Sequence, residues 1–363
     1  MFDKLEGIEE RLEALDAQLM DPEVTRDTRR LGDISRERRH VGKIVEAWRQ
    51  YRDLEAQIAD NRELLHDDDD DIRQMAKEEL GALEESLEKT SDALKLLLLP
   101  TDPYEGRPLL IEIRAGTGGD EAALFAGDLF KMYTRFAETR GLKLDVVSTN
   151  VVTVGAVGKT AQGYKEIIAS IRGDEAYNLF RYEGGVHRVQ RVPLTEAQGR
   201  IHTSAATVAV LPEPDEVEIK IEAKDLRIDT MRAGGPGGQS VNTTDSAVRI
   251  VHIPTGTTVQ CQDEKSQLKN KDKAMRVLKA RLLEVEQDAK HAEEAAARKA
   301  MVGSGDRSER IRTYNYPQNR ITDHRINLTL YKLDRVMMGD LDELVDGLAT
   351  ARQAELLKAE GLA

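Results

Sequence analysis

Residues Gly234–Ser240 read Gly-Gly-Pro-Gly-Gly-Gln-Ser, between two stretches that alternate apolar and polar residues, Leu226–Arg232 and Ala247–Ile253. Strict alternation is typical of a β-strand with one buried face. Glycines supply the backbone freedom that a sharp connection needs. The sequence therefore predicts that this loop projects from a sheet at the point where one strand passes to another.

Gln239 is the single functional side chain at the tip of the loop, because four glycines and Pro236 occupy the five positions before it. An amide donates and accepts hydrogen bonds but is a poor general base or nucleophile. The loop thus suits insertion into a crowded site, where it would orient a small molecule or an oxyanion. A plain connector and a phosphate cradle are the alternatives, although the Lys-Ser/Thr ending of a P-loop is replaced by Gln239-Ser240.

Length and composition predict a cytoplasmic protein of several domains. A chain of 363 residues is long enough for about two to four domains. Its one cysteine, Cys261, excludes a disulfide framework and a cysteine-cluster metal site, and we expect it to be a buried thiol in a strand at Thr257–Gln262. The first residues do not resemble a signal peptide, and no apolar run approaches the length of a membrane span.

The net charge of −13 is distributed unevenly. Residues 1–104 carry 16 Lys and Arg against 28 Asp and Glu, so the remainder of the chain is close to neutral. Within that remainder, Glu264–Arg281 and Arg298–Arg325 each contain seven basic residues. Local basic patches of this kind can meet a phosphate backbone, although charge runs are more often solvated helix faces.

Residues 1–104 are predicted to form an acidic antiparallel helical bundle. Leu5, Ile8, Leu12, Leu15 and Leu19 recur at alternating spacings of three and four, which is typical of a helix that packs on a neighbour. The same spacing continues later in the segment, at Val41, Ile44, Trp48, Tyr51 and Ile58 and at Leu80, Leu83 and Leu87. Asp67–Asp71 interrupts the pattern, and Pro100 and Pro103 end it. The segment carries no site chemistry, so we expect it to be a partner-docking or spacing module.

The rest of the chain has an α+β pattern, and the fold class predicted for the whole is α+β multidomain. A helix is expected from Asp120 and a long helix at Ser266–Arg298, which follows the glycine loop, while Gly303–Arg312 is expected to be mobile and Arg352–Ala363 a frayed helical tail. Further strands are expected at Leu109–Ile113, Leu144–Ser148, Tyr164–Ile171, Val217–Ala223 and Ile326–Tyr331. The predicted division is an α+β domain at 105–214, a β-rich domain with the glycine loop and long helix at 215–302, and a segment at 303–363 that packs back on 105–214.

Three long motifs resemble those of bacterial class I peptide chain release factors. Arg227–Asn242, which contains Gly-Gly-Gln, is similar to the catalytic loop of that family. Arg188–Ser204 (Arg-Val-Gln-Arg-Val-Pro-Leu-Thr-Glu-Ala-Gln-Gly-Arg-Ile-His-Thr-Ser) is similar to its stop-codon-reading segment, and Ile311–Ile326 to its late switch-loop region. Between Thr149 and Gln162 the chain departs from the family, where many members have a short acidic link.

The resemblance implies which residues act. Gly237, Gly238 and Gln239 match the catalytic tripeptide, and Gln239 matches a residue whose amide is methylated to N5-methylglutamine. Pro193-Leu194-Thr195 matches the branch of the family that reads UAA and UAG, whereas the branch that reads UAA and UGA carries Ser-Pro-Phe. The remaining codon-reading positions are matched by Gly118, Glu121, Gln190, His202 and Thr203.

The resemblance also implies the partners. They are the ribosome with its decoding and peptidyl transferase centres, the mRNA stop codon, peptidyl-tRNA, a glutamine methyltransferase and a class II release factor GTPase. No metal, organic cofactor or membrane is implied, and the protein would not be an enzyme away from the ribosome. The alternatives are a factor of the branch that reads UAA and UGA, a codon-independent rescue factor and a free peptidyl-tRNA hydrolase. Pro193-Leu194-Thr195 disfavours the first, the intact decoding motif disfavours the second, and the lack of a general base in the loop disfavours the third.

Overall fold

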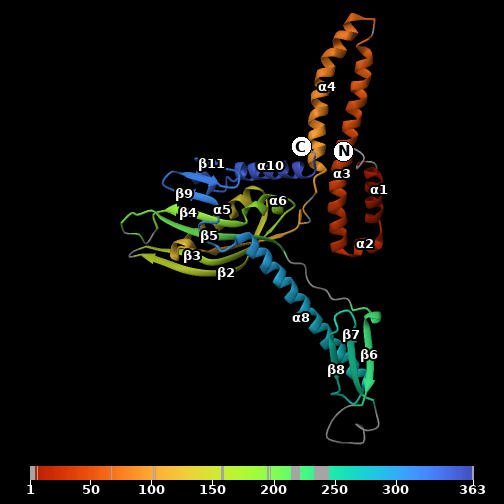
Figure 1. Cartoon of the computed structure of the whole chain (residues 1–363), viewed down its shortest axis with the longest axis vertical. Coiled ribbons are helices and arrows are strands. Elements are labelled where there is room, and N and C mark those ends of the chain that lie inside the picture. Colours follow the sequence, from red (N-terminus) through yellow and green to blue (C-terminus); the bar gives the residue numbers. More distant parts are fainter. Residues whose placement is uncertain are drawn as a thin grey trace.

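The computed structural model describes residues 5, 7–66, 68–100, 102, 104–156, 159–193, 196, 198–213, 221–232 and 245–361. They form an N-terminal group of helices, a large sheet with its covering helices, and a small sheet carried by a long helix (Figure 1). The mixed, multidomain α and β architecture expected from the sequence is thus confirmed.

The N-terminal helices are α1 (Ile8–Leu19), α2 (Pro22–Arg26), α3 (Thr28–Leu64) and α4 (Asp70–Leu97). The long α3 and α4 form an antiparallel hairpin that extends away from both sheets (Figure 1). The expected acidic break lies between them, where the Asp69 carboxylate caps α4 by accepting from the Asp71 N–H at 2.9 Å. Leu15 and Val41, from the predicted stripes, are buried together with Val45 where α1 packs on α3.

An eight-stranded sheet, in the order β11-β10-β9-β4-β5-β1-β3-β2, forms the centre of the molecule. All its neighbouring pairs are antiparallel except β4 with β9, which is parallel. The bounds of its strands are β1 Leu109–Ala115, β2 Lys143–Ala156, β3 Lys159–Arg172, β4 Gly185–Arg191, β5 His202–Pro212, β9 Arg310–Asn315, β10 Arg320–Asp323 and β11 Leu328–Leu330.

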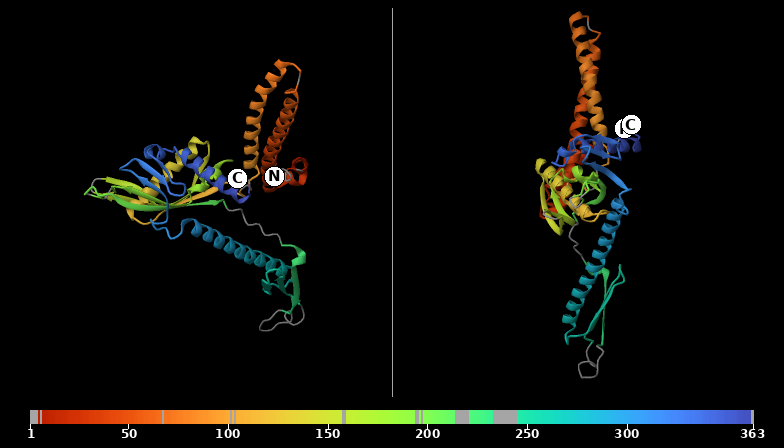
Figure 2. Two further views of the ribbon diagram at one scale, coloured as in Figure 1. Left: turned by 45° about the horizontal axis from the view of Figure 1, so that its top comes forward. Right: turned by 90° about the vertical axis from the view of Figure 1, so that its left-hand side faces the viewer.

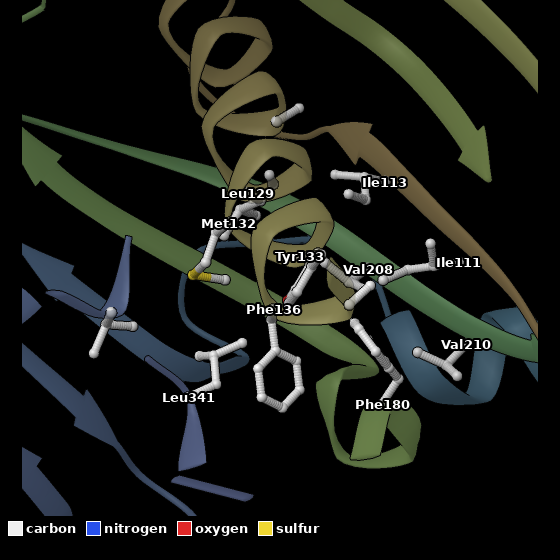
Figure 3. Close-up of a cluster of buried hydrophobic side chains, with 14 of the residues drawn as sticks. Ile111, Ile113, Leu129, Met132, Tyr133, Phe136, Phe180, Val208, Val210 and Leu341 are labelled. Atoms are coloured by element: carbon white, nitrogen blue, oxygen red, sulfur yellow. The ribbon is translucent and has the colours of Figure 1, made fainter. Parts of the chain in front are cut away.

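Helix α5 (Asp120–Thr139) covers one face of this sheet and supplies much of the main core (Figure 3). Its Leu129, Met132, Tyr133 and Phe136 are buried against strand residues that alternate along the sheet. The short helix α6 (Ala176–Phe180) and the one-turn helix η2 (Arg181–Glu183) come before β4, and α9 (Leu333–Val336) and α10 (Asp342–Ala359) follow β11.

The three-stranded sheet is formed by β6 (Leu226–Met231), β7 (Ala247–His252) and β8 (Thr258–Cys261), after a one-turn helix η3 (Ala223–Asp225). Its inner face packs on the first half of α8 (Gln267–Val302), where Val248, Ile250, Ala274 and Leu278 are buried together. Figure 2 shows this small sheet standing apart from the large one, with α8 as the helix between them. Cys261 is buried in β8, as expected.

The β2–β3 hairpin occupies the stretch in which the chain departs from the pattern of the family. The two strands stay paired from Lys143 with Arg172 to Ala156 with Lys159, with register irregularities between Val146 and Ser148 and between Asn150 and Val151. The described residues of this stretch, 149–156 and 159–162, therefore lie in the two paired strands, and their β-branched residues match that conformation.

Two expectations are wrong in part. Gly303–Arg312 does not remain irregular throughout, because β9 begins at Arg310 and Arg312 is fully buried. In Val217–Ala223, the described residues 221–223 form no strand, and a 3-10 turn begins at Ala223.

Strands β4, β5, β9 and β10 were not predicted from the sequence pattern. Along the described ranges, no helix combines the length and apolar character that crossing a bilayer requires.

Candidate functional site

The described codon-reading candidates gather where β4 ends, β5 begins and α5 starts. Gln190 lies opposite Thr203, and Arg191 opposite His202, in the β4–β5 register. The turn before α5 is tied to the same strand, because the Gly116 N–H donates to Ala205 O at 2.9 Å and the Ala205 N–H donates to Thr117 O at 2.8 Å. Six of the eight matched residues, Gly118, Glu121, Gln190, Pro193, His202 and Thr203, thus share one end of the large sheet. Leu194 and Thr195 lie outside the described residues.

Gly118 has a φ of +136°, a conformation that side chains rarely adopt. A Cβ added there would lie 2.6 Å from Ser204 Cβ on β5. Only glycine therefore lets the turn approach the strand this closely, and the backbone of the helix tip is left as the group that a ligand could contact.

Glu121 is held in place by Arg191, a residue that the sequence reasoning did not single out. Arg191 Nε donates to Glu121 Oε1, and Arg191 Nη1 donates to Asp128 Oδ2 at 2.6 Å. Burial acts to lower the pKa of Arg191, but Asp128 and Glu121 outweigh it and raise that pKa above its ordinary value. Glu121 Oε2 is buried without a hydrogen-bond partner among the described residues. Arg191 therefore fixes one carboxylate oxygen, while the other is enclosed without a donor among the described residues.

Gln190 is oriented by Asn315 of β9, since Asn315 Nδ2 donates to Gln190 Oε1 at 3.2 Å. The Tyr316 N–H also donates to Gln190 O at 3.1 Å, which ties the end of β4 to the turn after β9. No described residue accepts from the Gln190 NH₂ group, so its two donors are available to a base edge. Asn315 lies in the third family motif, Ile311–Ile326, and membership of that motif was the one sequence feature that could have drawn attention to it.

His202 is about half exposed, and its Nε2 lies 2.8 Å from Glu196 Oε2. The Gln198 N–H, which donates to Glu196 at 2.7 Å, and His202 together hold the pKa of Glu196 below its usual value against the effect of burial. The imidazole is thus fixed at one edge while its face is accessible for stacking on a base. Pro193 is buried beside this segment, and its carbonyl accepts from the Glu196 N–H at 3.1 Å.

A buried charge network lies beneath this surface, and it too was missed. Arg312 donates to both Glu183 oxygens, at 2.6 and 2.8 Å, and through Nε to Asp323 at 3.1 Å. The three side chains are at most 1% exposed. His187 Nε2 donates to the Glu183 carbonyl at 2.9 Å, so a neutral ring accepts from Tyr314 OH at Nδ1. Burial, reinforced by Arg312, lowers the pKa of His187 to about 4.

The catalytic candidates Gly237, Gly238 and Gln239 lie outside the described residues, but the base of their loop is described. Strands β6 and β7 pair up to Met231 with Ala247, so the loop joins two neighbouring strands as predicted. At this base, Asn270 of α8 is fully buried: its Nδ2 donates to Ser246 O and Glu264 O at 2.8 Å, and its Oδ1 accepts from the Glu264 N–H at 2.9 Å. One side chain thus joins β7, the segment after β8 and the start of α8.

In the described part of the chain, no group of three or more His, Cys, Asp or Glu side chains is arranged to hold a metal ion.

Known proteins resemble the chain along nearly its whole length. The profile of the PCRF domain matches residues 8–208, and that of the RF-1 domain matches residues 215–325. The chain is 56% identical to peptide chain release factor 1 of Maridesulfovibrio salexigens, over 99% of both chains. It is 57% identical to the protein of that name from Nitratidesulfovibrio vulgaris, again over 99% of both. Among solved structures, RF2 of Thermus thermophilus is 37% identical, with a TM-score of 0.48 and coverage of 96% of this chain and 97% of that one.

Proposed function

Because the chain belongs to the class I peptide chain release factors and acts in translation termination, we propose that it reads UAA and UAG and triggers hydrolysis of peptidyl-tRNA through Gln239. The observation that carries this proposal is the clustering of six matched residues at the β4–β5 end, with a partner side chain holding Glu121, Gln190 and His202.

The codon choice rests on Pro193-Leu194-Thr195, the tripeptide of the branch that reads UAA and UAG. Single-stranded bases are read by hydrogen bonds to their edges and by stacking on planar side chains. In this proposal the tip of α5, with Gly118 and Glu121, meets the first base through backbone groups. The Thr195 hydroxyl and the His202 ring meet the second, and Gln190 with Thr203 meets the third.

For the hydrolysis step, we propose that the Gln239 backbone N–H donates to the developing oxyanion or to the leaving hydroxyl. The side chain would help to admit water, and Gly237 and Gly238 would allow close approach to the ester. One such donor typically contributes about 10²–10³ in rate. The rest of the catalysis would come from ribosomal RNA and tRNA, so the protein is not an enzyme in isolation.

The same proposal assigns the parts of the chain. Residues 1–104 would dock on the ribosome, 105–214 with 303–363 would read the codon, and 215–302 would carry the catalytic loop. A glutamine methyltransferase acting on Gln239 and a class II release factor GTPase complete the expected partners. The place of action is where ribosomes translate, the cytoplasm.

The test is release of labelled formyl-peptide from ribosomes programmed with UAA, UAG, UGA or a sense codon. We expect efficient release on UAA and UAG and weak release on UGA. Thr195→Ala should weaken release on both stop codons, whereas Thr195→Ser keeps the hydroxyl and should retain most of it. Comparable release on UGA and UAG would contradict the codon assignment, and no release on any stop codon would contradict the function.

A further inference from the structure

Three arginines gather on the face of the large sheet that α5 does not cover. In β4, His187 and Val189 face the core, so the alternation of a strand places Arg188 on the opposite face. On the parallel neighbour β9, Thr313 is paired with Arg188 and so lies on that same face. Arg310 is paired with Val186, next to a register irregularity between Val186 and His187, and its charge acts on Arg188. Arg307 lies in the turn just before β9.

Arg188 and Arg310 have positive neighbours where an ion pair would be expected, whereas Arg307 also lies close enough to Asp306 for its charge to lower the pKa of that carboxyl. The Nε atoms of Arg188 and Arg310 are both buried without a hydrogen-bond partner among the described residues, and Arg310 Nη1 donates to Ser308 O at 3.4 Å. Burial, followed by the charges of Arg310 and Arg307, lowers the pKa of Arg188, yet an arginine stays protonated at neutral pH. No ion pair involves any of the three arginines within the described residues.

His324 adds a fourth polar group to this face. Its Nε2 lies 2.8 Å from the Thr313 hydroxyl, beside Arg188 in the register. Burial and the charges of Arg310 and Arg188 lower the pKa of His324, which favours a neutral ring. A fold gains nothing from like charges held together, since each disfavours the other. An anion bound among these arginines would relieve that repulsion and accept hydrogen bonds from their guanidinium N–H groups.

The cluster adjoins the codon-reading surface. Arg188 lies two residues before Gln190 on the same face of β4, and Thr313 lies two residues before Asn315 on the same face of β9. The anion that approaches Gln190 in a factor that reads mRNA is nucleic acid. Arginine, with its fork of N–H donors, is suited to a phosphate.

We propose that Arg188, Arg310 and Arg307 form a binding site for a phosphate of an RNA backbone, directly beside the residues that read the third codon base. This inference rests on the proposed function, because it takes an RNA next to Gln190 as given. Phosphate contacts position a protein on RNA without carrying sequence information. The site would therefore strengthen binding equally on every stop codon that the factor reads.

The experiment compares Arg188→Gln and the double variant Arg188→Gln/Arg310→Gln with Arg335→Gln, which removes an exposed arginine elsewhere in the domain. Release on UAA and UAG ribosomes gives the half-saturating factor concentration and the maximal rate at several salt concentrations. We expect the half-saturating concentration to rise about tenfold for Arg188→Gln and further for the double variant, with an unchanged maximal rate. Its logarithmic dependence on salt should weaken by about 0.7 per lost phosphate contact.

The outcomes separate phosphate binding from a role in packing. A rise no greater than that of Arg335→Gln, or a rise that differs between UAA and UAG, would overturn the proposal. Arg188→Lys keeps the charge but not the fork of donors and should recover part of the affinity. A lowered melting temperature of Arg188→Gln together with its weaker binding would mean that Arg188 serves the packing of β4. The melting temperatures of the Gln variants should be unchanged or higher, since a like charge has been removed.

The source of the phosphate is resolved with an mRNA that carries neutral methylphosphonate linkages around the stop codon. If the difference between wild type and Arg188→Gln disappears on this mRNA, the phosphate belongs to mRNA; if it persists, the phosphate belongs to ribosomal RNA. Both results support the site. Wild-type release on UAA and UAG in the same assay tests the proposed function separately, so failure of this inference alone leaves that release intact.

Discussion

In the large sheet, candidate reading side chains are each fixed by a hydrogen bond from a neighbouring side chain. In the small sheet, the described contacts fix only the two ends of the glycine loop. Arg191 fixes Glu121 and Asn315 fixes Gln190, above a buried network centred on Arg312. In the small sheet, the pairing of Met231 with Ala247 and the bonds of Asn270 hold the base of the loop. Reading a base requires side chains in fixed positions. To donate to a reacting ester, a backbone N–H at the tip of a glycine-rich loop needs a fixed loop base and a backbone that can come close to the ester.

The largest effect is expected from breaking the network under the reading surface. Arg312→Met would leave Glu183 and Asp323 buried without their shared cation, and removing one partner of a buried ion pair costs about 3–5 kcal/mol. Hydrogen exchange should show lost protection in β4, β5 and β9 and unchanged protection in β6, β7 and β8. Arg335→Met, at an exposed site, should change stability by less than about 0.5 kcal/mol. Equal loss of protection in both sheets would remove the contrast between them.

The next effect concerns the loop itself. Gln239→Pro removes the backbone N–H, and we expect single-turnover release at saturating factor to fall at least about 10²–10³-fold. Gln239→Ala keeps that donor and should retain substantial release. Binding to stop-codon ribosomes, measured separately, should be unchanged in both variants because the reading residues lie on the other sheet. Wild-type release rates for Gln239→Pro would disprove the backbone-donor mechanism.

A variant at Asn270 tests whether the base of the loop affects the release step without affecting ribosome binding. Asn270→Ala leaves buried backbone groups at Ser246 and Glu264 without a partner, which should destabilise the small sheet by about 2–3 kcal/mol. We expect the maximal release rate to fall while the half-saturating concentration stays the same. Asn315→Ala is the matched truncation on the large sheet, and it should alter codon discrimination with an unchanged maximal rate. The comparison would be wrong if the two truncations had the same kinetic signature.

The smallest effect is a pH dependence confined to the large sheet. The pKa of His187 is lowered to about 4, so folding favours the neutral ring. Its contribution is fully present above the unfolded pKa of about 6.5 and is lost as the pH falls toward 4, by about 2 kcal/mol at pH 5. Urea unfolding at pH 7.5 and 5.0 measures this loss, and His187→Gln should reduce it. Below about pH 4.5, protonation of Glu183 adds further loss, because Arg312 outweighs burial and lowers its pKa. An identical pH slope in wild type and variant would exclude His187 as the cause.

The sequence predicted the helical bundle, the long helix and the strands around the glycine loop, because their periodicities are local. It missed β4 and β9 because polar or charged residues stand at buried positions there, His187 in β4 and Arg312 in β9, and these hide the apolar–polar alternation of a strand. Arg312 lies in a segment expected to be mobile, because charged residues indicate exposure unless their partners are known. Those partners, Glu183 and Asp323, come from separate parts of the chain.

For the site, the family motifs identified the positions that match reading residues, but not the residues that orient them. Arg191 and Asn315 lie inside the quoted motifs, yet only the register of β4 with β5 and β9 shows which side chain each one holds. A contact between residues far apart in the chain depends on the order of the strands in the sheet, and that order cannot be inferred from the local spacing of residues.

The number of residues in helix α8 sets both the distance between the two sheets and their rotation relative to each other. Its 36 residues span about 54 Å at 1.5 Å per residue. Its buried residues lie at Asn270–Leu282, against the small sheet, and Arg298 pairs with Glu112 of the large sheet, so the middle of the helix packs on neither. Deleting one residue in that middle would shorten the reach by only about 1.5 Å but turn the small sheet by about 100°. The aim of the glycine loop is therefore far more sensitive to the residue count of α8 than its reach is.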